Sequence, residues 1–165
     1  MPANMSEILN AAGRVLDRDA IVAETRSAKE AGKTIVFANG CFDVLHAGHI
    51  RYLQGARELG DVLVVAINAD EQVQALKGSG RPILGERERA ELVASIEVVD
   101  FVTVFAEPTV EQLLLAIQPD VHAKGTDYTE ETVPERDVVR SFGGRVAIAG
   151  DPKNHSTSEM LKRIK

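Results

Sequence analysis

The sequence of 165 residues is short of several residue types, and each shortage excludes a class of protein. Its single cysteine, Cys41, rules out a disulfide within the chain, so a reducing compartment is expected. Aromatic residues make up 4% and tryptophan is absent, so the core must be largely aliphatic. Positive charge is outweighed, with a net charge of −6. Such a chain gains little from counterion release, which argues against nucleic acid as a partner.

Long hydrophobic runs are also missing. The longest apolar stretch, residues 62–67, is far too short to cross a bilayer. Residues 1–8 contain no basic segment followed by an apolar run, so no secretory signal is expected. We therefore predict a cytoplasmic protein with no membrane association. The remaining composition, 44% hydrophobic and 27% charged, is ordinary for a globular domain.

What the sequence does contain is a regular alternation of apolar runs and helical patterns. Short β-branched runs predict strands at 34–37, 62–67, 98–105, 120–124 and 145–149. Helical spacing predicts helices at 50–59, 70–77, 86–96, 110–117, 134–142 and 158–164. Strands separated by helices form a parallel sheet that is covered on both faces. The predicted fold class is α/β, a three-layer doubly wound (Rossmann-like) domain with a five-stranded parallel sheet.

The chain is predicted to divide into an N-terminal helical extension, 1–33, and one domain, 34–165. The extension would hold a short helix at 6–16 and an amphipathic helix at 20–31, capped by Asp19 and ended by Gly32.

In a doubly wound sheet, ligands bind beyond the carboxyl ends of the strands. Segments 40–49, 124–127 and 151–157 follow predicted strands, so we expect them to meet at one site.

The segment from Gly40 to His49 has the strongest chemical character. Gly40 permits close approach of the backbone to a ligand, and Gly48 permits close approach of His46 and His49. His49 lies at the start of the next helix, where free N–H groups and the positive end of the dipole favour an anion. Two imidazoles there can donate to phosphate oxygens as charge moves onto a leaving group.

Two other interpretations of this segment stay open at this stage. A zinc site needs three or more protein ligands, and His122 and His155 show no ligand spacing to the pair. Cys41 could be a nucleophile, but a cysteine after a buried strand is more often a small apolar residue. We expect no metal ligands and no covalent intermediate.

Gly40-Cys-Phe-Asp43 followed by His46-Ala-Gly-His49 resembles the signature of the cytidylyltransferase-like nucleotidyltransferases. A second mark of that family, a Ser-Thr-Thr-like start to the last helix, is matched by Ser156-Thr-Ser158. Lys77, Arg89 and the segment 124–127 also fall at family-like positions. The resemblance covers about residues 34–164.

Within that superfamily, segments 37–43, 77–82 and 124–128 are most similar to the heptose 1-phosphate adenylyltransferase branch. The glycerol-phosphate cytidylyltransferase branch has an arginine near the start of its Ser-Thr loop, where this sequence has Asp151-Pro-Lys153. The resemblance implies transfer of AMP from ATP to D-glycero-β-D-manno-heptose 1-phosphate, giving ADP-heptose and pyrophosphate for lipopolysaccharide core biosynthesis. A glycerol 3-phosphate cytidylyltransferase and a non-catalytic nucleotide sensor are the alternatives.

The resemblance also assigns roles to residues. It implies catalysis by His46, His49 and Lys77. It implies nucleotide binding by Gly40, Cys41, Phe42, Gly48, Arg89, Gly125, Asp127, Ser156 and Thr157. It implies substrate binding by Asn39, Asp43 and Lys77. ATP and a sugar phosphate are the expected partners, Mg²⁺ the cofactor that accompanies ATP, and a homodimer the expected assembly.

Two of these assignments have structural alternatives. Arg89 is equally well explained as a solvated helix cation paired with Glu86. Ser156 and Thr157 are equally suited to cap the last helix, a role compatible with anion binding.

Overall fold

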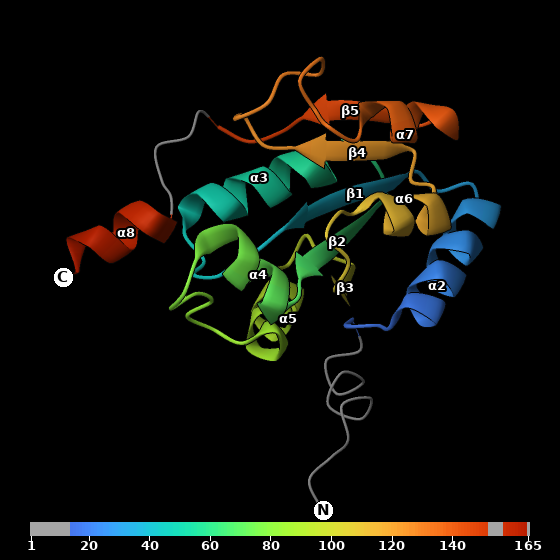
Figure 1. Ribbon diagram of the computed structural model, residues 1–165. Helices are drawn as coiled ribbons and strands as arrows, with labels where there is room; N and C mark the ends of the chain where they lie inside the picture. Colours follow the sequence, from blue (N-terminus) through green and yellow to red (C-terminus); the bar gives the residue numbers. More distant parts are fainter. Residues whose placement is uncertain (1–13, 152–156, 165) are drawn as a thin grey trace, which may run out of the picture.

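The computed structural model describes residues 14–151 and 157–164 and has one parallel sheet at its centre (Figure 1). The strands are β1 (Ile35–Gly40), β2 (Val62–Asn68), β3 (Phe101–Phe105), β4 (Val121–Lys124) and β5 (Arg145–Ile148). Their order is β3-β2-β1-β4-β5, and every neighbouring pair is parallel. The predicted five-stranded parallel sheet is confirmed.

Helices cover both faces of the sheet, which completes the predicted three layers (Figure 1). They are α2 (Arg18–Glu30), α3 (Ala47–Arg57), α4 (Asp70–Lys77), α5 (Glu86–Ala94), α6 (Glu111–Ile117), α7 (Arg136–Ser141) and α8 (Thr157–Arg163). On one face Leu53 of α3 and Val93 of α5 pack on the strands; on the other, α2, α6 and α7 do so. Among the described residues, no helix is long and apolar enough to cross a membrane.

The strand order places a topological switch between β1 and β4. From β1 the chain moves outward through β2 to β3, then crosses back so that β4 pairs with the other side of β1. The helices after β1 and β4 therefore lie on opposite faces of the sheet, which leaves a crevice at the carboxyl ends of these two strands. The fold thus predicts where the binding site lies.

Residues 14–30 belong to the core, where the sequence suggested an extension. Ile21 of α2 is fully buried in the layer that also contains Leu114. Val15, predicted to be helical, instead forms a parallel bridge to Val102 in β3. Arg14 and Leu16 are not helical either, and residues 6–13 of the predicted helix lie outside the described residues.

Most helix and strand boundaries agree closely with the predicted ones, and α4 agrees at both ends. The cap of α2 is Asp17, not Asp19, because the Asp17 carboxylate accepts from the Ala20 N–H at 2.8 Å. The strand predicted from Val98 starts at Phe101, since Val99 still donates to the Ile96 carbonyl in a turn that follows α5.

Candidate active site

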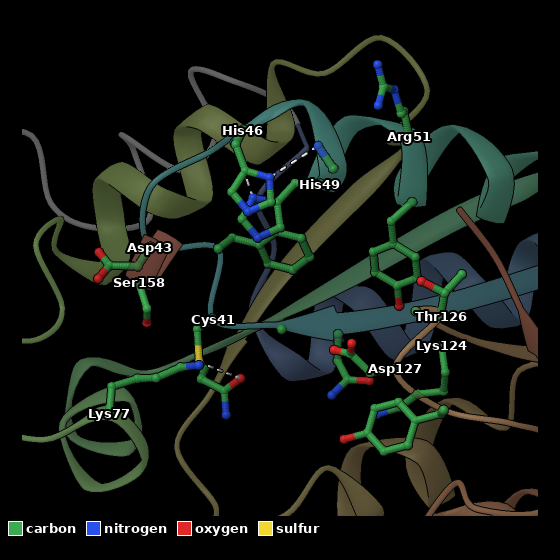
Figure 2. Close-up of a pocket in the computed structure, with 18 of the residues that line it drawn as sticks. Cys41, Asp43, His46, His49, Arg51, Lys77, Lys124, Thr126, Asp127 and Ser158 are labelled. Atoms are coloured by element: carbon green, nitrogen blue, oxygen red, sulfur yellow. Dashed lines mark hydrogen bonds between the residues drawn. The ribbon is translucent and has the colours of Figure 1, made fainter. Parts of the chain in front are cut away.

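A pocket of about 390 Å³ opens at the carboxyl ends of β1 and β4, where the strand order predicts a crevice (Figure 2). Most of the residues predicted to form the site line it: Asn39, Gly40, Cys41, Phe42, Asp43, His46, Gly48, His49, Lys77, Gly125 and Asp127. These residues come from β1, the turn between β1 and α3, α3, α4 and the loop after β4. The predicted meeting of separate segments at one site is therefore observed.

His46 and His49 are locked together at the start of α3. His46 is the N-cap, and its Nδ1 accepts from the Gly48 N–H at 3.1 Å. His49 reaches back, so that its Nδ1 accepts from the His46 N–H at 3.3 Å. Two of the expected free N–H groups at this helix start are therefore already bonded to imidazole nitrogens. What is left to attract an anion is the helix dipole and the imidazoles themselves.

These capping bonds select the tautomer of each ring. A ring nitrogen that accepts from a backbone N–H cannot carry a proton, so the proton of each neutral imidazole lies on Nε2. The two rings stack with their centroids 3.9 Å apart and their planes inclined by 21° (Figure 2). The site therefore presents two Nε2–H donors side by side on one wall of the pocket.

Phe42 supports the histidine pair from below. Its ring centroid lies 5.3 Å from that of His49, and its backbone has a φ of 49°, a left-handed conformation that is unusual for a phenylalanine. This turn folds the ring back over Gly40, where an added Cβ would come within 3.0 Å of Phe42 Cε2. Gly40 is therefore needed to admit the Phe42 ring, whereas the sequence suggested close approach to a ligand.

Cys41 and Lys77 face each other across the pocket floor. Figure 2 shows Lys77 extending from the end of α4 toward the Cys41 thiol. Burial raises the pKa of the Cys41 thiol, against the opposing charges of Lys77 and Arg89. The thiol is therefore protonated at neutral pH, and a protonated thiol is a poor nucleophile. Cys41 therefore lines the pocket without acting as a nucleophile, and its Sγ lies 3.8 Å from Asn68 Oδ1.

Asp43 holds a loop, so its carboxylate is not free to bind a substrate. It accepts from Arg81 Nε at 2.6 Å and from the N–H groups of Ile83 and Leu84, and its side chain is 1% exposed. Burial opposes ionisation, but these donors hold the pKa of Asp43 below its usual range. Asp43 thereby presents Arg81, which also lines the pocket.

Arg89 does not line the pocket, and the interpretation of it as a solvated cation is wrong, while its predicted nucleotide binding stays a prediction. Its side chain is fully buried in α5, so it is not a solvated cation paired with Glu86. Its guanidinium donates to the carbonyls of Leu84, Cys41 and Asn68 and to the carboxylate of Asp70, the last at 2.7 Å. Arg89 therefore joins the residues that follow β1 and end β2 to the start of α4.

Lys124 also lines the pocket. It belongs to the family-like segment 124–127, but no role was predicted for it from the sequence. It ends β4, and its Nζ lies 3.7 Å from Glu135 and 4.6 Å from the centre of the Tyr128 ring. Burial lowers the pKa of the Lys124 ammonium, although the carboxylate of Glu135 opposes the shift. The pocket therefore has a partly buried cation on the side away from Lys77.

A profile of the family described as cytidylyltransferase-like matches residues 37–162. The chain belongs to the cytidylyltransferase-like family. The match covers the sheet from β1 onward together with the histidine pair, and the predicted nucleotidyltransferase family is confirmed. Among the described residues of this domain, no group of three His, Cys, Asp or Glu residues could hold a metal ion.

Relatives of this cytidylyltransferase-like domain include longer proteins. The bifunctional protein HldE of Pelobacter propionicus is 43% identical over 167 residues, covering 96% of this chain and 34% of that protein. The bifunctional protein HldE of Ectopseudomonas mendocina is 46% identical, covering 92% and 32%. The chain thus spans about a third of the length of these curated relatives. A lipopolysaccharide core biosynthesis protein from Thermoplasma volcanium has 28% identity and a TM-score of 0.64, covering 74% of this chain and 100% of that one.

The last predicted segment of the domain is only partly described. Ser156 lies outside the described residues, and Thr157 opens α8. Its neighbour Ser158 lines the pocket. The structure therefore brings the start of α8 to the site and leaves the predicted roles of Ser156 and Thr157 as predictions.

Sequence reasoning missed a polar rim that crosses the mouth of the pocket. Arg51 of α3 pairs with the Asp151 carboxylate at 3.3 Å, and the Thr126 hydroxyl donates to the Asp151 carbonyl at 2.8 Å. Tyr52, also on α3, donates to the Ala123 carbonyl at 2.6 Å and lines the pocket. Arg51 and Tyr52 directly follow the His46–His49 turn, and that position was the available signal.

Proposed function

We propose that this chain transfers the AMP group of ATP to D-glycero-β-D-manno-heptose 1-phosphate, with release of pyrophosphate. The observation that carries this proposal is the stacked pair His46 and His49, with two Nε2–H donors on the wall of a pocket at the switch point of the sheet. Paired donors of this kind suit a reaction in which negative charge shifts between phosphate oxygens.

The heptose substrate is supported by resemblance. Segments 37–43, 77–82 and 124–128 are similar to heptose 1-phosphate adenylyltransferases, and all three contribute residues to the pocket. The structural relative from Thermoplasma volcanium is described as a lipopolysaccharide core biosynthesis protein. ADP-heptose for that biosynthesis is the product that fits both observations.

The proposed step needs no nucleophile from the protein. A phosphate oxygen of the sugar phosphate, which is already anionic, attacks the α-phosphorus of ATP and forms a new P–O bond. The bond from the α-phosphorus to the bridging oxygen breaks, and pyrophosphate leaves with its electron pair. Catalysis then consists of positioning the two phosphates and stabilising the charge that moves onto the leaving group. His46 and His49 would donate from Nε2 to the oxygens that gain charge.

Two lysines on opposite sides of the pocket would bring the reactants together. Lys77 ends α4 and Lys124 ends β4, so the two cations belong to different elements of the switch point. Each phosphate group carries negative charge, and two phosphates repel each other unless cations lie between or beside them. We assign Lys77 to bind both the sugar phosphate and the triphosphate. We assign Lys124 to add positive charge on the opposite side of the same pocket.

Magnesium is proposed to arrive on the triphosphate, held mainly by phosphate oxygens and water. Among the carboxylates that line the pocket, Asp43 is bonded to the 81–84 loop and Asp151 to Arg51, so neither is assigned to the ion. When bound, the ion would neutralise charge on the triphosphate.

Pyrophosphate release tests the proposal directly. The purified chain is mixed with Mg²⁺ and four substrate pairs: ATP or CTP, each with heptose 1-phosphate or glycerol 3-phosphate. We expect the pair of ATP and heptose 1-phosphate to react fastest, with ADP-heptose identified by mass spectrometry. Light scattering on the same sample tests the homodimer, which stays a prediction.

Each other outcome names a different function. A faster reaction of CTP with glycerol 3-phosphate would make the chain a cytidylyltransferase and would reject the heptose substrate. Binding of ATP without pyrophosphate release from any pair would favour the nucleotide sensor. The His46 variants described below serve as the catalytic controls.

A further inference from the structure

His122 is a buried histidine that the proposed reaction does not use. It lies in β4 opposite Phe37 of β1, its side chain is fully buried, and its ring meets the Phe37 ring edge-on at 5.4 Å. Burial, with a smaller contribution from the charge of Lys124, lowers the pKa of His122 to about 3. The ring is therefore neutral at physiological pH. An apolar side chain would fill this place without the desolvation of an imidazole.

Within residues 14–151 and 157–164 the ring makes one hydrogen bond, and its partner lines the pocket. His122 Nε2 lies 2.8 Å from Oδ1 of Asn39, and Asn39 lines the pocket at the end of β1. His122 Nδ1 is buried, and none of the residues that the structure describes gives it a hydrogen-bond partner. Protonation on Nδ1 would bury an unpaired donor and set two acceptors, Nε2 and Oδ1, against each other. Protonation on Nε2 satisfies the bond and leaves an unpaired acceptor, which proteins tolerate better.

The direction of this bond sets the orientation of Asn39. An asparagine amide can present either its oxygen or its NH₂ group to a ligand, and the two differ by rotation about one bond. Because the His122 Nε2–H holds the amide oxygen, the Nδ2 group is the one left to donate. Such a donor binds oxygen acceptors, the kind that phosphates and sugar hydroxyls provide.

We propose that His122 is a positioning residue that fixes the Asn39 amide with its NH₂ group toward a phosphate or hydroxyl oxygen of the substrates. The proposal rests on the proposed function, since it assigns Asn39 to substrate binding in that pocket. His122 itself touches no ligand and acts only through Asn39. This orientation has an energetic cost, because the Nδ1 atom is buried and has no hydrogen-bond partner among the described residues.

A double-mutant cycle tests the coupling of the two residues. His122→Leu removes the donor and keeps an apolar side chain beside Phe37, and Asn39→Ala removes the amide. We expect each variant to lower kcat/KM about tenfold, the loss of roughly one hydrogen bond. The double variant should be no worse than Asn39→Ala alone, within about twofold. Losses that multiply in the double variant, or normal kinetics in His122→Leu, would overturn the proposal.

Two matched variants separate positioning from stability. His122→Gln places an amide nitrogen near the site of the imidazole Nε2, so it should retain kcat/KM within about threefold of the wild type. Val121→Ala, at the neighbouring buried position in β4, should lower the melting temperature and leave kcat/KM unchanged. Equal kinetic losses in His122→Gln and His122→Leu would show that the ring is needed only for packing.

Two further measurements keep the test independent of folding and of the proposed function. If His122→Leu does not fold, ¹⁵N NMR of the wild-type ring decides: a proton on Nε2 supports the proposal, and a proton on Nδ1 overturns it. If the chain transfers no AMP, the same cycle is measured on the Kd values for ATP and for heptose 1-phosphate. A coupled loss for either ligand would then support the positioning role while the proposed function fails, and additive losses for both would reject it.

Discussion

Each imidazole of the pair at the start of α3 has two tasks at opposite edges of its ring. Nδ1 accepts from a backbone N–H and so caps the helix, while Nε2–H is the donor that we propose acts on a phosphate. The same bonds that start the helix therefore determine which nitrogen can act on a phosphate. Helix capping and catalysis are coupled at these two residues, and substitution can separate them.

His46→Asn should remove catalysis and keep the helix. The Asn oxygen lies near the position of Nδ1 and is a good N-cap acceptor, but no donor remains near Nε2. We expect kcat to fall by about 10²–10³, as on loss of a transition-state donor elsewhere, with an almost unchanged melting temperature. His46→Ala should lose about 1 kcal/mol of stability in addition. Near-normal turnover in His46→Asn would reject the catalytic role.

The buried ring of His122 predicts a pH dependence of stability. Between its pKa of about 3 in the folded protein and the usual 6.5, the unfolded chain binds a proton that the folded chain does not. The free energy of unfolding should therefore fall as the pH falls below 6.5, by about 1.4 kcal/mol per pH unit for this group. Glutamine does not titrate, so the free energy of unfolding of His122→Gln should not fall in this way. Relative to the wild type it should rise by about 2 kcal/mol between pH 7 and pH 5.

Urea unfolding of both proteins at pH 7, 6 and 5 measures this difference. Other groups titrate equally in the two proteins, so they cancel in the comparison. A constant gap between wild type and variant over this range would mean that the ring takes up a proton in the folded protein as readily as in the unfolded one.

At the scale of elements, α5 is tied to the site from behind. Arg89 donates to the carbonyl of Cys41, in the loop after β1, and to the carbonyl of Asn68, at the end of β2. These bonds fix the position of Cys41 and Asn68, both of which line the pocket. Helix α5 therefore holds residues of the pocket in place, although no side chain of α5 lines the pocket.

Arg89→Lys should destabilise the protein strongly. A lysine has three donors on one nitrogen and cannot reproduce the planar fork that serves four acceptors. We expect a loss of roughly 3 kcal/mol, because buried carbonyls are left unpaired. Glu88→Ala, at an exposed position of the same helix, should change stability by less than about 0.5 kcal/mol. Full stability with a raised KM for ATP would instead restore the nucleotide contact that the sequence suggested.

At the scale of the whole molecule, α2 completes one of the two layers that cover the sheet. Ile21 contacts the same cluster as Ile35 of β1 and Leu114 of α6. A domain that began at residue 34 would leave this apolar face exposed to water. The folding unit therefore includes α2.

Ile21→Ala tests this role. The substitution leaves a cavity beneath α2, so it should lower the free energy of unfolding by about 2–4 kcal/mol, measured by urea denaturation. Glu24→Ala, at an exposed position of the same helix, should be nearly neutral. If both variants are equally stable, α2 would be the separable extension that the sequence predicted.

The sequence by itself determined the succession of strands and helices along the chain and the position of the histidine turn. Hydrophobic period reports which residues are buried in an element, and it placed α4 and all five strands within a few residues. The position of the turn was also predictable because its residues are local: His46 and His49 are three residues apart, although their capping bonds were not predicted. Contacts between residues that are close in the sequence can be predicted from the sequence alone.

Only the tertiary structure decided which distant groups meet. Asp43 bonds Arg81, 38 residues away, and His122 bonds Asn39, 83 residues away. Arg89 is buried because two strand ends supply carbonyls beside it, which its own helix cannot reveal. Such partners depend on strand order and register, and a period of 2 or 3.6 residues carries no information on either.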